Sequence, residues 1–123
     1  MTATASELGK YLEEHASNGT FVCYSEVAEH FLIPNTIKWK DNPLSQLCGF
    51  LDKEDTDAYR PLRTSVIVLK DGIKKTVPSK GYFRKLSDYR KIPIAKTAPE
   101  KRRVHGEELQ RLWKHYGFQP KTE

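Results

Sequence analysis

The sequence contains little cysteine and no spacing typical of a metal site. Its two cysteines, Cys23 and Cys48, lie far apart, and neither belongs to a CxxC pair. Such cysteines in a cytosolic chain are more often reduced and buried than bonded to each other, although the spacing alone permits a disulfide. The four histidines show neither HxxxH nor Cys-His spacing. We therefore expect no metal ion and no other cofactor.

Long hydrophobic runs are also absent. No apolar stretch approaches the roughly 18 residues that a membrane-spanning helix needs. The N-terminal residues lack a basic region followed by an apolar core, so we expect no secretory signal. These observations predict a cytoplasmic protein that does not contact a membrane. A length of 123 residues, with 37% hydrophobic and 30% charged residues, is typical of one folded domain, which we expect to span 1–123.

Charge is distributed unevenly along the chain. The formal net charge is +5. Residues 1–60 carry 5 Lys and Arg against 10 Asp and Glu, whereas residues 61–123 carry 16 against 6. An acidic first half and a basic second half indicate either a polyanionic partner or two halves that attract each other.

Three helices are predicted in the first half. The first spans 5–18, with Ser6 as its N-cap and Asn18-Gly19 at its end. A short strand is expected over 20–23. Ser25 then caps a second helix that reaches Phe31 or Leu32.

A polar connection over 33–42 leads to the third helix, which Asn42-Pro43 opens because proline is favoured in a first helical turn. Its apolar stripe comprises Leu44, Leu47, Cys48 and Leu51. Residues 53–59 predict a polar, acidic loop.

A β-hairpin is predicted next. Residues 65–69 are apolar or β-branched, as in a covered strand. Asp71-Gly72 is typical of a tight type I′ turn, because both central residues of that turn need positive φ. Residues 73–77 carry two lysines and precede Pro78, which indicates a solvent-exposed edge strand.

The remaining chain predicts a short helix over 84–90, a basic linker over 91–103 and an amphipathic helix over 105–117. Leu109, Leu112, Trp113 and Tyr116 form the buried side of that last helix. The order of elements predicts an α+β fold of the winged helix-turn-helix type. It has a small β-sheet, a β-hairpin wing and a C-terminal amphipathic helix.

From Tyr24 onward, the chain resembles the winged-helix domain of O6-alkylguanine-DNA alkyltransferases and alkyltransferase-like proteins. Tyr24-Ser-Glu-Val-Ala is similar to the Tyr-Gly-Glu-Leu-Ala that opens their helix-turn-helix. Asn35 and Leu47-Cys48-Gly49 stand near their Asn-Pro turn and Ala-Val-Gly recognition helix. Pro61-Leu-Arg-Thr-Ser-Val falls where the family has Pro-Cys-His-Arg-Val, and Lys70-Asp71-Gly72 resembles its following turn.

The departures from that family remove its chemistry. Leu62 stands in place of the nucleophilic cysteine, and Arg63 and Thr64 in place of the His-Arg pair. Gln46 lies near the position of the recognition-helix arginine. Without a thiolate at that position there is no acceptor for an alkyl group, and Cys48 lies on an apolar stripe. We therefore expect that the protein is not an enzyme. Its resemblance to this family still implies nucleic-acid binding.

Residues 74–103 contain 11 basic residues and 2 acidic ones, with Tyr82, Phe83 and Tyr89 among them. Cations that contact phosphates, together with aromatic rings that stack on bases, are common on nucleic-acid-binding surfaces. The sequence therefore predicts that a basic wing and the segment after it bind DNA or RNA. The candidate contact residues are Tyr24, Trp39, Gln46, Arg63, Lys74, Lys75, Lys80, Tyr82, Arg84 and Lys85.

Other interpretations of the same residues stay open. The basic half could instead be a solvated surface. It could also belong to an interaction module, such as a phage-encoded inhibitor that masks a host defence protein. Trp39 could stack on a base or form a lid over the core. Sequence-specific reading is not expected, because the third helix offers only Gln46 and Lys53 to bases. We expect Trp113 in the core or in a dimer contact, and both His105 and His115 at the surface.

Overall fold

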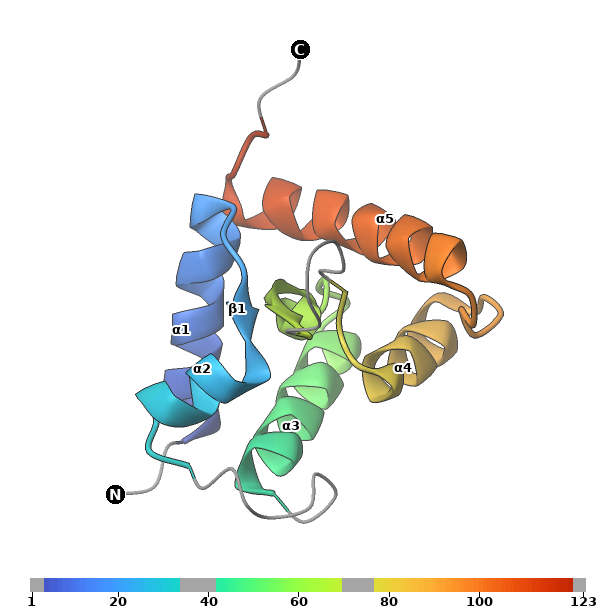
Figure 1. Ribbon diagram of the computed structural model, residues 1–123. Coiled ribbons are helices and arrows are strands. Elements are labelled where there is room, and N and C mark those ends of the chain that lie inside the picture. The colour runs from blue at the N-terminus through green and yellow to red at the C-terminus, as the bar shows by residue number, and fades with distance from the viewer. Residues whose placement is uncertain (1–3, 34–41, 70–76, 121–123) are drawn as a thin grey trace.

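The computed structural model describes residues 4–33, 42–69 and 77–120, and over these residues the chain is mostly helical (Figure 1). The elements, in order, are α1 (Ala5–Asn18), β1 (Val22–Cys23), α2 (Tyr24–His30), α3 (Pro43–Asp57), the 3-10 helix η2 (Arg63–Val66), β2 (Ile67–Val68), α4 (Lys80–Arg90) and α5 (Ala98–Tyr116). The predicted winged helix-turn-helix with a β-hairpin wing is wrong. In the described residues, five α-helices surround two short strands that pair in parallel.

Helix α1 has the predicted bounds, but Thr4 rather than Ser6 is its N-cap. The Thr4 hydroxyl accepts the N–H of Glu7, and the Glu7 carboxylate accepts the N–H of Thr4. This capping box needs a Glu or Gln three residues after the cap, which Thr4 has. The helix ends at Gly19, whose φ of 68° lies in the left-handed region that glycine adopts without strain.

Strand β2 pairs in parallel with β1. Val22 aligns with Ile67, and Cys23 with Val68. Both residues of β2 are buried, as expected of a parallel strand that is covered on its two faces. The Leu69 N–H donates to the Val77 carbonyl at 2.8 Å, which brings Val77 beside the end of β2. The predicted Asp71-Gly72 turn and the return strand before Val77 lie outside the described residues.

Helix α3 begins at the predicted Pro43, with the Asn42 side chain as its cap. It continues to Asp57, so the predicted acidic loop over 53–59 is helical for most of its length. The prediction failed because Asp55, although polar, is fully buried and pairs with Arg63 from another part of the chain. Helix α2 begins at Tyr24, one residue before the predicted cap Ser25.

The last two helices are longer than predicted. Helix α4 begins at Lys80, four residues before the predicted start. Helix α5 begins at Ala98, so residues 98–103 of the predicted basic linker are helical. Thr97 and Glu100 form a second capping box there, and Pro99 stands in the first turn, where its missing N–H costs nothing.

The core is built around the segment 61–68, which is buried at every position. Helices α1, α3 and α5 pack against η2 at the centre of the molecule (Figure 1). The larger apolar cluster joins α1, α2, α3 and α5 through residues that include Leu8, Leu12, Val27, Leu44, Leu51, Leu109 and Leu112. A smaller cluster lies between α4 and α5 and contains Leu62, Tyr82, Phe83, Leu86, Ala95 and Val104.

Candidate functional site

The predicted contact residues do not form one surface. Trp39, Lys74 and Lys75 lie outside the described residues, so their roles stay predictions. Gln46, Lys80, Arg84 and Lys85 are exposed, whereas Tyr24 is half-buried and Arg63 and Tyr82 are buried. Four of the predicted contact residues are therefore open to solvent, whereas two are covered by the rest of the fold.

Arg63 is part of the internal support of the fold. It is 5% exposed, and its guanidinium reaches Glu13 at 2.9 Å, Glu54 at 2.6 Å and Asp55 at 3.1 Å. Asp55 also accepts the backbone N–H of Arg63 at 3.0 Å. These carboxylates neutralise the buried cation, so Arg63 is not available to a phosphate. This placement corrects its predicted role in nucleic-acid contact.

Tyr82 is likewise unavailable for base stacking, because it is only 4% exposed. Its hydroxyl lies 2.6 Å from the Ser65 hydroxyl, and its ring meets the ring of His105 edge-on. His105 is 3% exposed and its Nε2 lies 2.8 Å from the Ser65 carbonyl oxygen, so the expectation of a surface histidine is wrong. Burial lowers the pKa of His105, which keeps the ring neutral in the core.

A polar pocket of about 180 Å³ lies where α3, η2 and the start of α4 meet. It exceeds by several times the volume of about 30 Å³ that one water occupies in the liquid. Three of the predicted contact residues, Tyr24, Tyr82 and Lys85, line it. Its other lining residues are Ser45, Cys48, Gly49, Asp52, Thr64, Ser79 and Gly81.

Asp52 is the central charge of the polar pocket. It is 6% exposed, and its Oδ1 accepts the Thr64 hydroxyl at 2.6 Å. Its Oδ2 lies 3.9 Å from the ammonium of Lys85, at the limit of an ion pair. Burial raises the pKa of Asp52 to about 6, although the Thr64 hydroxyl and the Lys85 ammonium favour the ionised form.

The Cys48 thiol and the Tyr24 hydroxyl of the polar pocket stay protonated at neutral pH. Burial raises the pKa of the Cys48 thiol, and the neighbouring Asp52 raises it further. Burial also raises the pKa of Tyr24 to about 12, and its hydroxyl donates to the Ser79 hydroxyl at 3.2 Å. A protonated, buried thiol is a poor nucleophile. The pocket is suited to hydrogen bonding with a small polar group.

The sequence interpretation missed Asp52, Thr64 and Ser79 as members of this pocket. Asp52 stands four residues after Cys48, at helical spacing on the buried side of α3, which is a signal that the sequence does carry. Thr64 and Ser79 come from other segments, and no local pattern connects them with α3.

Exposed cations concentrate on α4 and on the residues that follow it. Residues 77–103 contain nine Lys and Arg against Asp88 and Glu100. Arg90 is bound by the buried Glu108, and Arg103 pairs with Glu107. Six other cations of this region are exposed, and we call them the basic surface: Lys80, Arg84, Lys85, Lys91, Lys96 and Arg102. Among the described residues, the only carboxylate within 4.0 Å of any of their charged groups is that of Asp52, which lies near Lys85.

Helix α5 begins close to α4, which keeps the basic surface together. The Lys101 ammonium lies 5.8 Å from the centre of the Phe83 ring, which is on α4 next to Arg84. Arg84 and Lys80 are four residues apart and share one face of α4. Lys80 and Arg84 therefore form a short row of cations along one face of α4.

Other sequence expectations can be compared with the structure. Cys48 is a buried free thiol, and Cys23 is half-buried. Within residues 4–33, 42–69 and 77–120, no group of three His, Cys, Asp or Glu side chains could hold a metal ion. Nor does any helix in those ranges have the length and apolarity to cross a membrane. Trp113 packs against the larger core cluster as predicted, and His115 is exposed.

Comparisons of the chain with protein-family models, with curated proteins and with solved structures give no match. The resemblance to alkyltransferases therefore stays an expectation from the sequence. The function is therefore inferred from the geometry and charge of the described residues.

Proposed function

We propose that the protein binds nucleic acid through the basic surface on α4 and at the start of α5. The observation that carries this proposal is the excess of cations over carboxylates in residues 77–103, nine against two. Exposed cations without carboxylate partners attract phosphates strongly, because each contact releases condensed counterions from the nucleic acid. The proposal assigns the contacts to Lys80, Arg84, Lys85, Lys91, Lys96 and Arg102.

The binding that we propose follows the phosphate backbone and does not read sequence. Among the exposed positions of α3, only Gln46 and Lys53 carry side chains that commonly contact bases. Lys53 pairs with Asp57 at 2.9 Å. Affinity is therefore expected to depend on salt and hardly on base sequence.

Fluorescence anisotropy with labelled DNA duplex, single-stranded DNA and RNA tests this proposal between 50 and 200 mM salt, the range over which phosphate contacts weaken strongly. Replacing Lys80, Arg84 and Lys85 together by Gln removes up to three phosphate contacts. The slope of log affinity against log salt should then become shallower by about 0.9 for each lost contact, or about 2.7 on duplex.

A matched control carries Lys10→Gln, Lys53→Gln and Lys114→Gln, which remove the same charge from exposed positions elsewhere. This control should keep most of the salt slope, and circular dichroism should show that both variants are folded. Equal loss in both variants would mean that net charge alone attracts the nucleic acid. No binding to any of the three probes at the lowest salt would refute the proposal and favour the interaction-module interpretation.

A further inference from the structure

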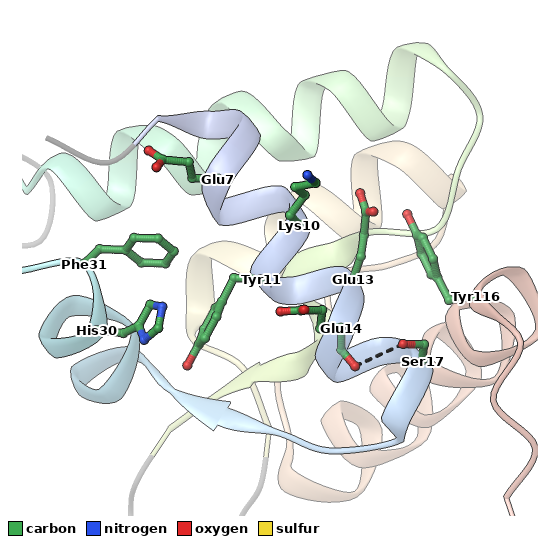
Figure 2. Close-up of a pocket in the computed structure, with 9 residues that line it drawn as sticks. All are labelled: Glu7, Lys10, Tyr11, Glu13, Glu14, Ser17, His30, Phe31 and Tyr116. Atoms are coloured by element: carbon green, nitrogen blue, oxygen red, sulfur yellow. Dashed lines mark hydrogen bonds between the residues drawn. The ribbon is translucent and has the colours of Figure 1, made fainter.

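An open groove lies on the face of the molecule formed by α1 and α2, away from the basic surface. Its volume is about 570 Å³, and α1, α2 and the end of α5 contribute to its walls (Figure 2). Glu7, Glu13 and Glu14 line it together with one lysine, Lys10. We call it the acidic groove. No residue of the proposed nucleic-acid surface takes part in it.

Aromatic rings form one end of the acidic groove. The Tyr11 ring stacks on the His30 ring, with centroids 4.4 Å apart and an interplanar angle of 23°. The Phe31 ring meets Tyr11 edge-on at 5.3 Å. Figure 2 shows Tyr11 and His30 side by side, with Phe31 next to them. Packed rings of this kind offer a preformed surface to aliphatic groups and to cations.

The lining of the acidic groove carries more negative than positive charge. It contains three glutamates and one lysine, a net of −2. Glu7 is used in the cap of α1, and Glu13 pairs with Arg63. Glu14 is exposed, and none of the ion pairs found in the described part of the chain includes it. The groove therefore favours a cationic occupant.

The connection between α4 and α5 has the complementary chemistry. Residues 91–96 read Lys-Ile-Pro-Ile-Ala-Lys and contain no regular secondary structure after Lys91. Ile94 is 43% exposed, and Lys91 and Lys96 at the two ends are exposed as well. We call this segment the cationic connection. An exposed aliphatic residue between two lysines matches a groove that combines aromatic rings with glutamates.

The dimensions also agree. Glu7 and Glu14 are seven helical residues apart, or about 10 Å along α1. Lys91 and Lys96 are five positions apart, so the backbone between them spans at most about 18 Å. Lysine side chains are long and flexible, so both ammonium groups can reach carboxylates while Ile94 contacts the rings.

One copy cannot fill its own acidic groove. Helices α1 and α2 lie on the left of Figure 1 and the cationic connection lies at the right edge, with α3 and the central segment between them. We propose that the acidic groove of one molecule binds the cationic connection of a second copy. Such a contact joins two different surfaces, so it is heterologous and continues from one molecule to the next in a head-to-tail manner.

Sedimentation equilibrium without nucleic acid tests this proposal, using two variants that are each blocked on one side. Glu14→Arg reverses a charge in the acidic groove. Ile94→Asp combined with Lys96→Glu removes the complementary side chains from the cationic connection. Asp57→Arg is the control, because it makes the same charge change as Glu14→Arg at an exposed position outside both surfaces. All three variants should show the circular dichroism of the folded protein.

At 50 mM salt, the mean mass of the original protein should rise with protein concentration beyond the mass of a dimer. At 500 mM salt this association should be weaker, because surface charges are then screened. Each blocked variant alone should associate at least about tenfold more weakly, since like charges then face each other. A mixture of the two should form a 1:1 dimer and nothing larger.

Three results would overturn the proposal. The first is a monomer at all concentrations, which would leave the acidic groove to a different, cationic protein. The second is association that stops at a dimer of the original chain, which indicates a two-fold interface. The third is association that neither blocked variant weakens more than Asp57→Arg does.

Discussion

Asp52 should make the folded protein less stable as the pH rises from about 4 to about 6. Its pKa is about 6 in the folded chain, against an ordinary value of 3.8, because burial penalises the ionised carboxylate. The folded state therefore holds this proton more tightly than the unfolded state does. The contribution of Asp52 to the free energy of unfolding is complete below the pKa that it has in the unfolded chain. It is lost as the pH rises through the pKa that it has in the folded chain. The difference of about two pKa units corresponds to about 3 kcal/mol.

The substitution Asp52→Asn removes this titration while keeping the shape of the side chain. The amide oxygen can still accept the Thr64 hydroxyl. Urea unfolding between pH 4 and pH 7 gives the free energy of unfolding of both proteins. The variant should gain about 3 kcal/mol relative to the original protein over that range.

Comparing the two proteins at each pH cancels the other titrations, including that of His105, which they share. Asp57→Asn is the matched control, because Asp57 is exposed and pairs only with Lys53 among the described residues. Its effect should stay within about 0.5 kcal/mol across the range. A difference between Asp52→Asn and the original protein that does not change with pH would refute the reasoning about burial of this carboxyl.

Three further predictions concern the fold. Arg63→Met should lower the free energy of unfolding by about 3–5 kcal/mol in urea titrations, because it leaves Asp55 buried without its main partner; a loss below 1 kcal/mol would show that water reaches Asp55. Gly19→Ala should lower the melting temperature by several degrees, since φ is positive there and a Cβ would collide with the Phe118 ring; an unchanged melting temperature would contradict this contact. Thr4→Ala should lower the free energy of unfolding in urea by about 1 kcal/mol, because the N-cap of α1 is lost. An equal decrease for Ser6→Ala would show that the cap is misplaced.

Features encoded by neighbouring residues could be predicted from the sequence. The end of α1 at Gly19 and the start of α3 at Pro43 follow from local signals, because each signal lies within a few residues of the structure that it determines. The prediction of a winged helix-turn-helix fold failed for the opposite reason. Of the strand predicted over 65–69, only Ile67 and Val68 form a strand, because Ser65 and Val66 belong to η2. The partner of β2 is Val22-Cys23, and nothing near Ile67 indicates a partner that far away.

The candidate site shows the same division. Composition alone located the cations of residues 77–103, and Lys80, Arg84 and Lys85 are exposed as a basic surface requires. The burial of Arg63 could not be predicted, because it depends on carboxylates from α1 and α3 that meet only in the folded chain. No residue next to Arg63 in the sequence is acidic, so nothing local indicates that this cation is paired.

The two core clusters have consequences for how the chain folds. The smaller cluster is made only of residues from Leu62 to Val104, whereas the larger one brings Leu8 and Leu12 of α1 against Leu112 of α5. Contacts between residues far apart in the sequence form slowly, because a long loop must close before any of them is made. We therefore expect α4 and the start of α5 to associate early, around the smaller cluster. During synthesis, α1 has to wait for the last helix before its apolar face is covered, and until then that face is available to chaperones and to aggregation.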